Sequence, residues 1–241
     1  WWLLLGVIIS GMSLLGHGVV KERYLTLEDT PQYNLIFSFS IIVVAAAAVM
    51  VGILGVRFYT AEKLFASAMQ ETDYSIIESK LQHVLSLRDK YDTYHISLSR
   101  AYLAQAGEFS KQVDPNIQAV GELLKKSVDE ARAATEISPH SVVAWENLAT
   151  VYENTYFLAP EAGQWVIDSV NSAIALEPSN PILMCRLGND YMAQNNAAKA
   201  IEYFQKAIEL KRDYLGAYLG LVSAYESNKD LDKAVEVYKT I

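Results

Sequence analysis

Hydrophobic and polar positions divide the chain into two unlike parts. Residues 1–20 and 35–56 are runs of 20 and 22 residues without a formal charge, and only six charged side chains lie before residue 61. At about 1.5 Å per residue, the second run reaches about 33 Å as a helix, against a hydrocarbon core of about 30 Å. The pattern predicts a membrane region at 1–60 with two spanning helices. A pair of buried core helices is the alternative.

The polar segment at residues 21–34 separates the two uncharged runs. It contains Pro31 and the aromatic residues Tyr24 and Tyr33, which is typical of a short loop at the lipid surface. No proline or glycine interrupts the chain between Val56 and Met69. The second span therefore either continues into the following part as one helix or breaks near Arg57.

From residue 57 onward the pattern is that of amphipathic helices, and the sequence shows no long strand-like alternation. This predicts an all-α fold. Residues 61–91 are expected to form connecting helices or a degenerate first repeat. Beyond residue 92, apolar and small residues recur with a period of 34 residues, which indicates stacked helical hairpins.

The repeat carries large residues in the first helix of each unit and small residues where the second helix crosses it. These signature positions are Trp145, Leu148, Tyr152, Leu187, Gly188, Tyr191, Ala200, Phe204, Ala207, Leu221, Tyr225, Ala234 and Tyr238. The pattern resembles the tetratricopeptide repeat. The resemblance implies an α-solenoid of about four to five helical hairpins over residues 92–241, with units near 92–141, 142–180, 181–214 and 215–241.

The pattern departs from the family at several places. Arg212 stands where proline is usual, and about five extra residues lengthen the turn near residues 157–161. A larger insertion at residues 107–120 contains Asp114-Pro115-Asn116 and is expected to be the one sizeable loop. An irregular helical bundle is the alternative to a regular solenoid.

In tetratricopeptide arrays the first helices line a concave groove. By this resemblance the groove side chains are Glu146, Thr150, Glu153, Asn154, Cys185, Asn189, Met192, Ser223 and Glu226. Arg100 is the only base at such a position, and the lysines with which related domains clamp a C-terminal carboxylate are missing. An extended peptide that offers backbone amides or a basic patch to Glu146, Glu153 and Glu226 fits better. The alternative is that these side chains are merely solvated.

Charge and composition exclude several classes of function. Residues 1–60 carry three acids and three bases, so the whole net charge of −8 lies in residues 61–241, and nucleic acid is not an expected partner. Cys185 is the only cysteine, which leaves no CxxC motif. The sequence also contains no HExxH, GxxxxGK[ST], GxSxG or GxGxxG motif. We therefore expect no catalytic residues, no metal and no cofactor.

These features predict a membrane-anchored scaffold, not an enzyme, with the lipid bilayer and a protein or peptide as partners. The alternative rests on architecture alone: terminal spans followed by repeats resemble bacterial O-antigen ligases or polymerases, which transfer lipid-linked glycans. In that case the chain would be the non-catalytic C-terminal segment of a longer protein, as Trp1 in place of an initiator Met also suggests. The expected location is the bacterial cytoplasmic membrane, and the ligase resemblance favours repeats on its extracytoplasmic side.

Overall fold

The structure is a computed structural model that describes residues 31–114, 116–156 and 158–240, with side chains from residue 38 onward. The chain forms two compact units, residues 1–55 and 56–241. The described part of the first unit belongs to helix α2 (Pro31–Ala68). The predicted first span at residues 1–20 lies outside the described residues.

Between residues 38 and 56, helix α2 is apolar on every side. The exposed fractions of Val44 and Val51 are both 68%, and the most apolar window of 18 residues within Ser38–Ala68 has a mean hydropathy of 2.7 with none of it buried. By length and composition this segment can cross a membrane. The helix continues through Arg57 without a break, as the first of the two sequence-based alternatives predicts.

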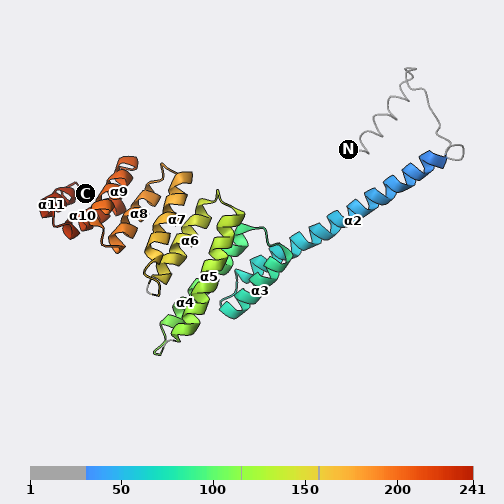
Figure 1. Cartoon of the computed structure of the whole chain (residues 1–241), viewed down its shortest axis with the longest axis horizontal. Helices are drawn as coiled ribbons and strands as arrows, with labels where there is room; N and C mark the ends of the chain where they lie inside the picture. Colours follow the sequence, from blue (N-terminus) through green and yellow to red (C-terminus); the bar gives the residue numbers. More distant parts are fainter. Residues whose placement is uncertain (1–30, 115, 157, 241) are drawn as a thin grey trace, which may run out of the picture. The chain divides into compact units, whose positions relative to one another are not determined.

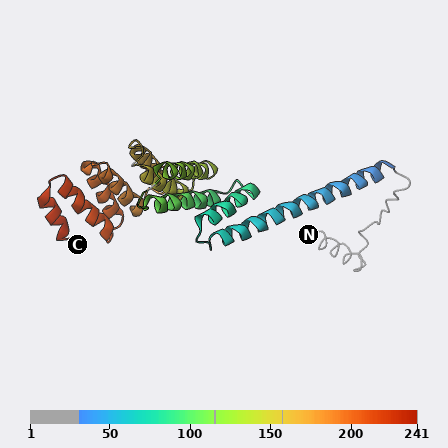
Figure 2. The same ribbon diagram turned by 90° about the horizontal axis from the view of Figure 1, so that it is seen from below.

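The second unit consists of helical hairpins, and consecutive helices lie side by side (Figures 1 and 2). The predicted all-α fold is confirmed for the described residues. After the end of α2, the helices are α3 (Tyr74–Leu87), α4 (Asp92–Ser110), α5 (Ile117–Ile137), α6 (Val142–Thr155), α7 (Ala162–Leu176), α8 (Pro181–Ala193), α9 (Ala197–Leu210), α10 (Leu215–Ser227) and α11 (Leu231–Tyr238).

The predicted loop at residues 107–120 is wrong in its extent. Helix α4 continues to Ser110 and α5 begins at Ile117, so the extra residues lengthen both helices and leave only a short connection. Asn116 starts α5, where its side chain accepts a hydrogen bond from the amide of Ala119 at 3.1 Å. The apolar periodicity of α5 then begins at once, with Val120, Leu123 and Leu124 buried.

The turns inside the last two hairpins repeat with the 34-residue period. Asn195 and Lys229 both adopt left-handed backbone conformations, with φ of 58° and 64°. The next amide in each turn reaches back to a tyrosine carbonyl: Asn196 N–H donates to Tyr191 O at 2.8 Å, and Asp230 N–H donates to Tyr225 O at 2.9 Å. These bonds satisfy carbonyls that the helix end would leave unpaired.

The buried small and large residues pack together in four clusters, and the largest cluster runs from Ala131 on α5 to Ala234 on α11. Among the signature residues, Trp145 is half-buried and Tyr238 is 55% exposed, while the others are buried. Tyr238 was expected to pack between helices, and its side chain is exposed among the described residues of α11. The packing predicted for Tyr238 therefore stays a prediction.

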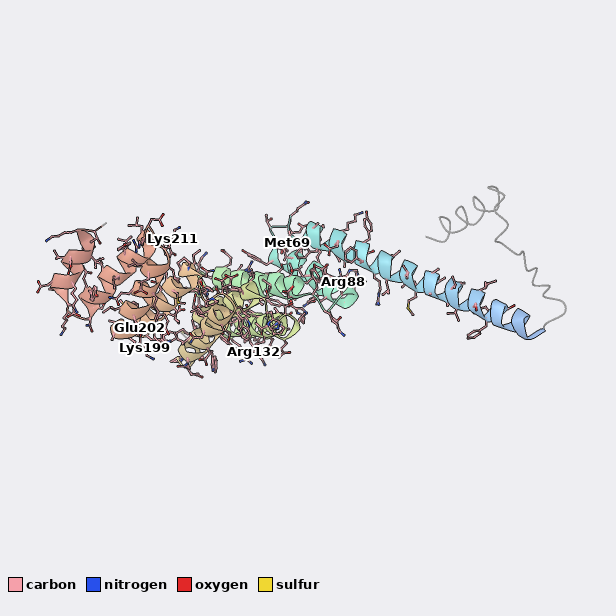
Figure 3. All side chains as sticks on the ribbon, turned by 90° about the horizontal axis from the view of Figure 1, so that it is seen from above. Met69, Arg88, Arg132, Lys199, Glu202 and Lys211 are labelled. Atoms are coloured by element: carbon pink, nitrogen blue, oxygen red, sulfur yellow. The ribbon has the colours of Figure 1, made fainter. Side chains whose placement is uncertain are left out.

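Three buried tyrosines are held in the same way, each by a donor 20 residues earlier on the preceding helix. Gln82 Nε2 donates to Tyr102 Oη at 3.1 Å, and Gln205 Nε2 donates to Tyr225 Oη at 3.1 Å. Arg132, labelled in Figure 3, donates from Nε to Tyr152 Oη at 2.8 Å. The buried hydroxyl thus finds a partner in each case, which fixes the distance between neighbouring hairpins.

Candidate functional site

The first helices of the hairpins form one surface of the second unit. Helix α4 contacts α6, and α8 contacts α10, while α5, α7, α9 and α11 form the other layer. Of the predicted groove residues on this surface, Glu146, Thr150 and Met192 are half-buried. The exposed ones are Glu153, Asn154, Asn189, Ser223 and Glu226.

Cys185 was expected in the groove, and the structure places it elsewhere. Only 5% of its surface is exposed, and its side chain belongs to the core. Burial raises the pKa of the Cys185 thiol, although a hydrogen bond with Tyr214 opposes this shift. Such a thiol is a packing group and a poor nucleophile, so Cys185 is corrected to a core residue.

Arg186, the next residue, was not predicted and joins α8 to α6. Its Nη2 donates to Thr150 Oγ1 at 2.8 Å and to Glu153 Oε1 at 2.6 Å, and Nη1 donates to Glu146 O at 3.3 Å. The guanidinium of Arg186 thus already pairs with the carboxylate of Glu153. The sequence analysis expected this carboxylate to bind a basic patch of a bound peptide. Counting groove positions missed Arg186 because its long side chain reaches the groove from the neighbouring position.

A second arginine lies across the groove from this bridge. Arg100 on α4 donates from Nε to Asn147 Oδ1 at 3.0 Å, and Asn147 Nδ2 donates to the buried Ser99 Oγ at 3.1 Å. Between the two arginines the surface is hollowed by a volume of about 250 Å³, lined by Arg100, Leu103, Glu146, Asn147, Thr150 and Arg186. The groove therefore contains two arginines, Arg100 and Arg186, whereas the sequence predicted only Arg100 there.

A separate pocket of about 130 Å³ lies where α6 ends and α7 begins, next to the last turn of α8. It contains Asp190, which is only 8% exposed. Burial raises the pKa of Asp190 to about 7, Glu153 adds to the rise, and Arg186 opposes it. The repeat signature has no acidic position here, so no pattern along the chain indicates that Asp190 is buried.

The polar side chains of the groove are suited to recognising a ligand. Within the described residues, no group of three or more His, Cys, Asp or Glu side chains is placed to hold a metal ion. The groove instead presents fixed hydrogen-bond donors and acceptors from three successive hairpins. Such a surface can read the charges and backbone of an extended segment.

The last two hairpins match a known family. Residues 185–241 match the family model described as tetratricopeptide repeat. None of the curated proteins matches the sequence.

Solved structures with the same kind of fold cover most of the chain. The chain is similar to the MamA protein, with a TM-score of 0.57 and 19% identity over 78% of this chain and 89% of that one. MamA from Desulfovibrio magneticus RS-1 gives a TM-score of 0.58 and 14% identity, with 76% and 92% covered. A thermophilic tetratricopeptide-repeat protein of Thermus thermophilus gives 0.50 and 19%, with 63% and 72% covered. At these identities the likeness establishes the fold alone, a helical solenoid of tetratricopeptide type.

Proposed function

We propose that the chain is a membrane-anchored scaffold that binds an extended segment of another protein in the groove formed by α4, α6, α8 and α10. The tetratricopeptide-type solenoid supports a role in protein–protein interaction. The apolar helix at Ser38–Ala68 supports the anchor.

The observation that carries the groove proposal is the polar network between α6 and α8. Arg186 binds Thr150 and Glu153 at the same time, so the wall of the groove is fixed before a partner arrives. A preorganised surface loses less side-chain entropy on binding than a mobile one. Glu146 and Glu226 make no ion pair within the described residues, so they are the carboxylates available to a basic segment.

The proposed location is the bacterial cytoplasmic membrane. The apolar helix supports the membrane, and the extracytoplasmic side is favoured only by the architectural resemblance to O-antigen ligases. In the described part of the chain no feature favours the glycan-transferring alternative, which stays a sequence-based prediction.

Site-specific photo-crosslinking tests the groove. A photoreactive residue in place of Asn189, an exposed groove residue on α8, leaves the Arg186 network intact, and the same residue in place of Lys125, exposed on α5, is the matched control on the other layer. We expect a discrete protein adduct in cells from position 189 and none from position 125. Adducts of equal yield from both positions, or none from position 189, would show that the partner does not bind in the groove.

A further inference from the structure

The pocket beside Asp190 combines apolar walls with one buried acid. It is lined by Glu153, Tyr156, Gly163, Val166, Asp190, Ala193 and Gln194. Its volume of about 130 Å³ is close to the roughly 150 Å³ of an engineered cavity that takes a benzene-sized ligand. The pocket is therefore large enough for one extended aliphatic side chain.

Asp190 is an incompletely paired group. More than nine-tenths of the residue is buried, and its Oδ2 has no hydrogen-bond partner among the described residues. Leaving a buried carboxylate oxygen unpaired is costly, so such a group calls for a proton or a cation. The unpaired oxygen belongs to a residue that lines the pocket.

The charges around the pocket do not balance. Arg186 lies 2.6 Å from Glu153, and Glu153 also hydrogen-bonds the Asp190 carboxyl group, which helps to raise the pKa of Asp190. When both carboxyl groups are ionised, two negative charges face this single guanidinium, and one of them is left over. A ligand with one positive charge would neutralise the group without leaving an excess of either sign.

The shape and lining of the pocket indicate which kind of cationic group fits it. Tyr156, Val166 and Ala193 offer contact for methylene groups. Gln194 uses its amide nitrogen to donate to Gly163 O at 2.7 Å, which leaves its amide oxygen as an acceptor. An ammonium is a compact charge on an aliphatic stem, whereas a guanidinium needs paired acceptors in a planar fork. These features fit an ammonium better than a guanidinium.

We propose that this pocket receives a lysine side chain of the bound protein, with the lysine ammonium group on Asp190 Oδ2. This inference rests on the proposed function, since the pocket lies beside the groove wall and shares Glu153 with it. It adds a specificity element: a lysine in the bound segment sets the register.

Lysine and a proton would compete for Asp190. Burial, and then Glu153, raise the pKa of this carboxyl to about 7, while Arg186 is the opposing charge. An ammonium can bind only after the carboxyl has lost its proton. Binding should therefore be tighter at pH 8 than at pH 6, and it should release protons near pH 7.

Calorimetry on the whole chain in lipid nanodiscs tests the proposal. The probes are a blocked pentapeptide with a central lysine, the same peptide with norleucine, and butylammonium alone. We expect the lysine peptide to bind at least about tenfold more tightly than the norleucine peptide, and Asp190→Asn to remove the difference. Glu136→Gln, which removes an exposed carboxylate on α5 outside both the groove and the pocket, is the control that keeps the difference.

Several outcomes would overturn the proposal. Equal binding of the lysine and norleucine peptides, or a preference that survives Asp190→Asn, would show that Asp190 does not select the ligand. Tighter binding of butylammonium than of the lysine peptide would point to a free amine. Unchanged circular dichroism of Asp190→Asn checks that the fold is intact. A groove adduct from position 189 without any lysine preference would end this inference and leave the proposed function standing. Lysine binding without the adduct would remove the groove as the site of protein binding and leave only a pocket that accepts a lysine.

Discussion

Phe204 illustrates how closely neighbouring hairpins approach. Its ring is fully buried between Gly188 on α8 and Gly220 on α10. A Cβ added at Gly188 would lie 2.7 Å from the ring, and one added at Gly220 would overlap it more severely. Only a hydrogen side chain fits at either position, so these glycines serve close packing and not an unusual backbone angle.

Replacing Gly220 with alanine should therefore destabilise the second unit. We expect the Gly220→Ala substitution to lower the free energy of unfolding by about 1 to 3 kcal/mol, because the ring or the helix must shift. Chemical unfolding followed by circular dichroism measures this loss. Gly107 on α4 has no atom within 4 Å of an added Cβ, so Gly107→Ala is the matched control and should stabilise by roughly 0.5 to 1 kcal/mol. Equal effects at both positions would contradict the packing account.

The sequence predicts the role of Gly188 but not that of Gly220. Gly188 belongs to the repeat signature, but the position 34 residues later is Val222, so periodicity gives no hint of Gly220. Cys185 was placed wrongly and the Arg186 partner of Glu153 was missed for a related reason. A position within a repeat gives the direction in which a side chain leaves the helix, but not the neighbour that it contacts. The roles of Arg186 and Asp190 depend on the packing of α8 against α6, which the sequence does not give.

At the scale of elements, a histidine bridge ties α4 to α5. His95 Nδ1 lies 2.6 Å from Glu130 Oε2, and its Nε2 lies 2.8 Å from Asp89 O. Both ring nitrogens thus face acceptors, which favours the doubly protonated ring. The hydrogen bond with Glu130 is the main cause of a raised pKa of His95, and burial opposes it.

This bridge makes the stability of the α4–α5 hairpin depend on pH. Because the pKa of His95 is higher in the folded than in the unfolded chain, its contribution is full below the unfolded value of about 6.5 and is lost as pH rises through the folded value. We expect the midpoint of thermal unfolding to fall over that window. In His95→Gln the fall should be smaller, with a loss of about 1 kcal/mol at low pH. A pH profile that the substitution leaves unchanged would exclude His95 as its source.

The sequence predicted the existence of the helices better than their ends. The insertion at 107–120 contains turn-forming residues, and these suggested a loop along its whole length. Helices α4 and α5 instead extend toward the turn, and their contact is fixed by Ser99 and Ser127, whose hydroxyls donate to each other's backbone carbonyls at 2.9 and 2.8 Å. Two serines that face each other where α4 and α5 cross form no pattern in a single sequence, so this contact could not be predicted.

For the whole molecule, two features of the sequence were decisive. The 34-residue recurrence predicted the solenoid because each hairpin must bury its apolar face against the next. The concentration of charge after residue 60 separated an apolar segment from the repeats. The hydrogen bonds between hairpins could not be predicted from the sequence. Arg186 and its partners lie 33 to 40 residues apart, and no sequence pattern connects them.

The apolar helix supports a final prediction about the whole chain. Val44 and Val51 lie within the uncharged run of α2 and are exposed on its surface, so in a bilayer they would face lipid. Arginine at the centre of a spanning helix costs about 2.5 to 3.5 kcal/mol per residue for insertion. We expect Val44→Arg with Val51→Arg to prevent insertion of α2. A C-terminal tag should then either leave the membrane fraction or move to the opposite side in protease-accessibility measurements.

Two matched arginines elsewhere separate this effect from a general loss of folding. Val143 on α6 and Val235 on α11 are each 51% exposed, so Val143→Arg with Val235→Arg adds the same charge to the solvated repeats. This control should leave the chain in the same membrane fraction, with its tag on the same side, as the unaltered chain. An arginine on a solvated surface stays in water, so it does not have to be transferred into hydrocarbon. If the α2 variant also keeps both, the helix is not in lipid. The exposed apolar surface of residues 38–56 would then need a protein to cover it, and the scaffold would be attached to the membrane by a partner instead of by its own chain.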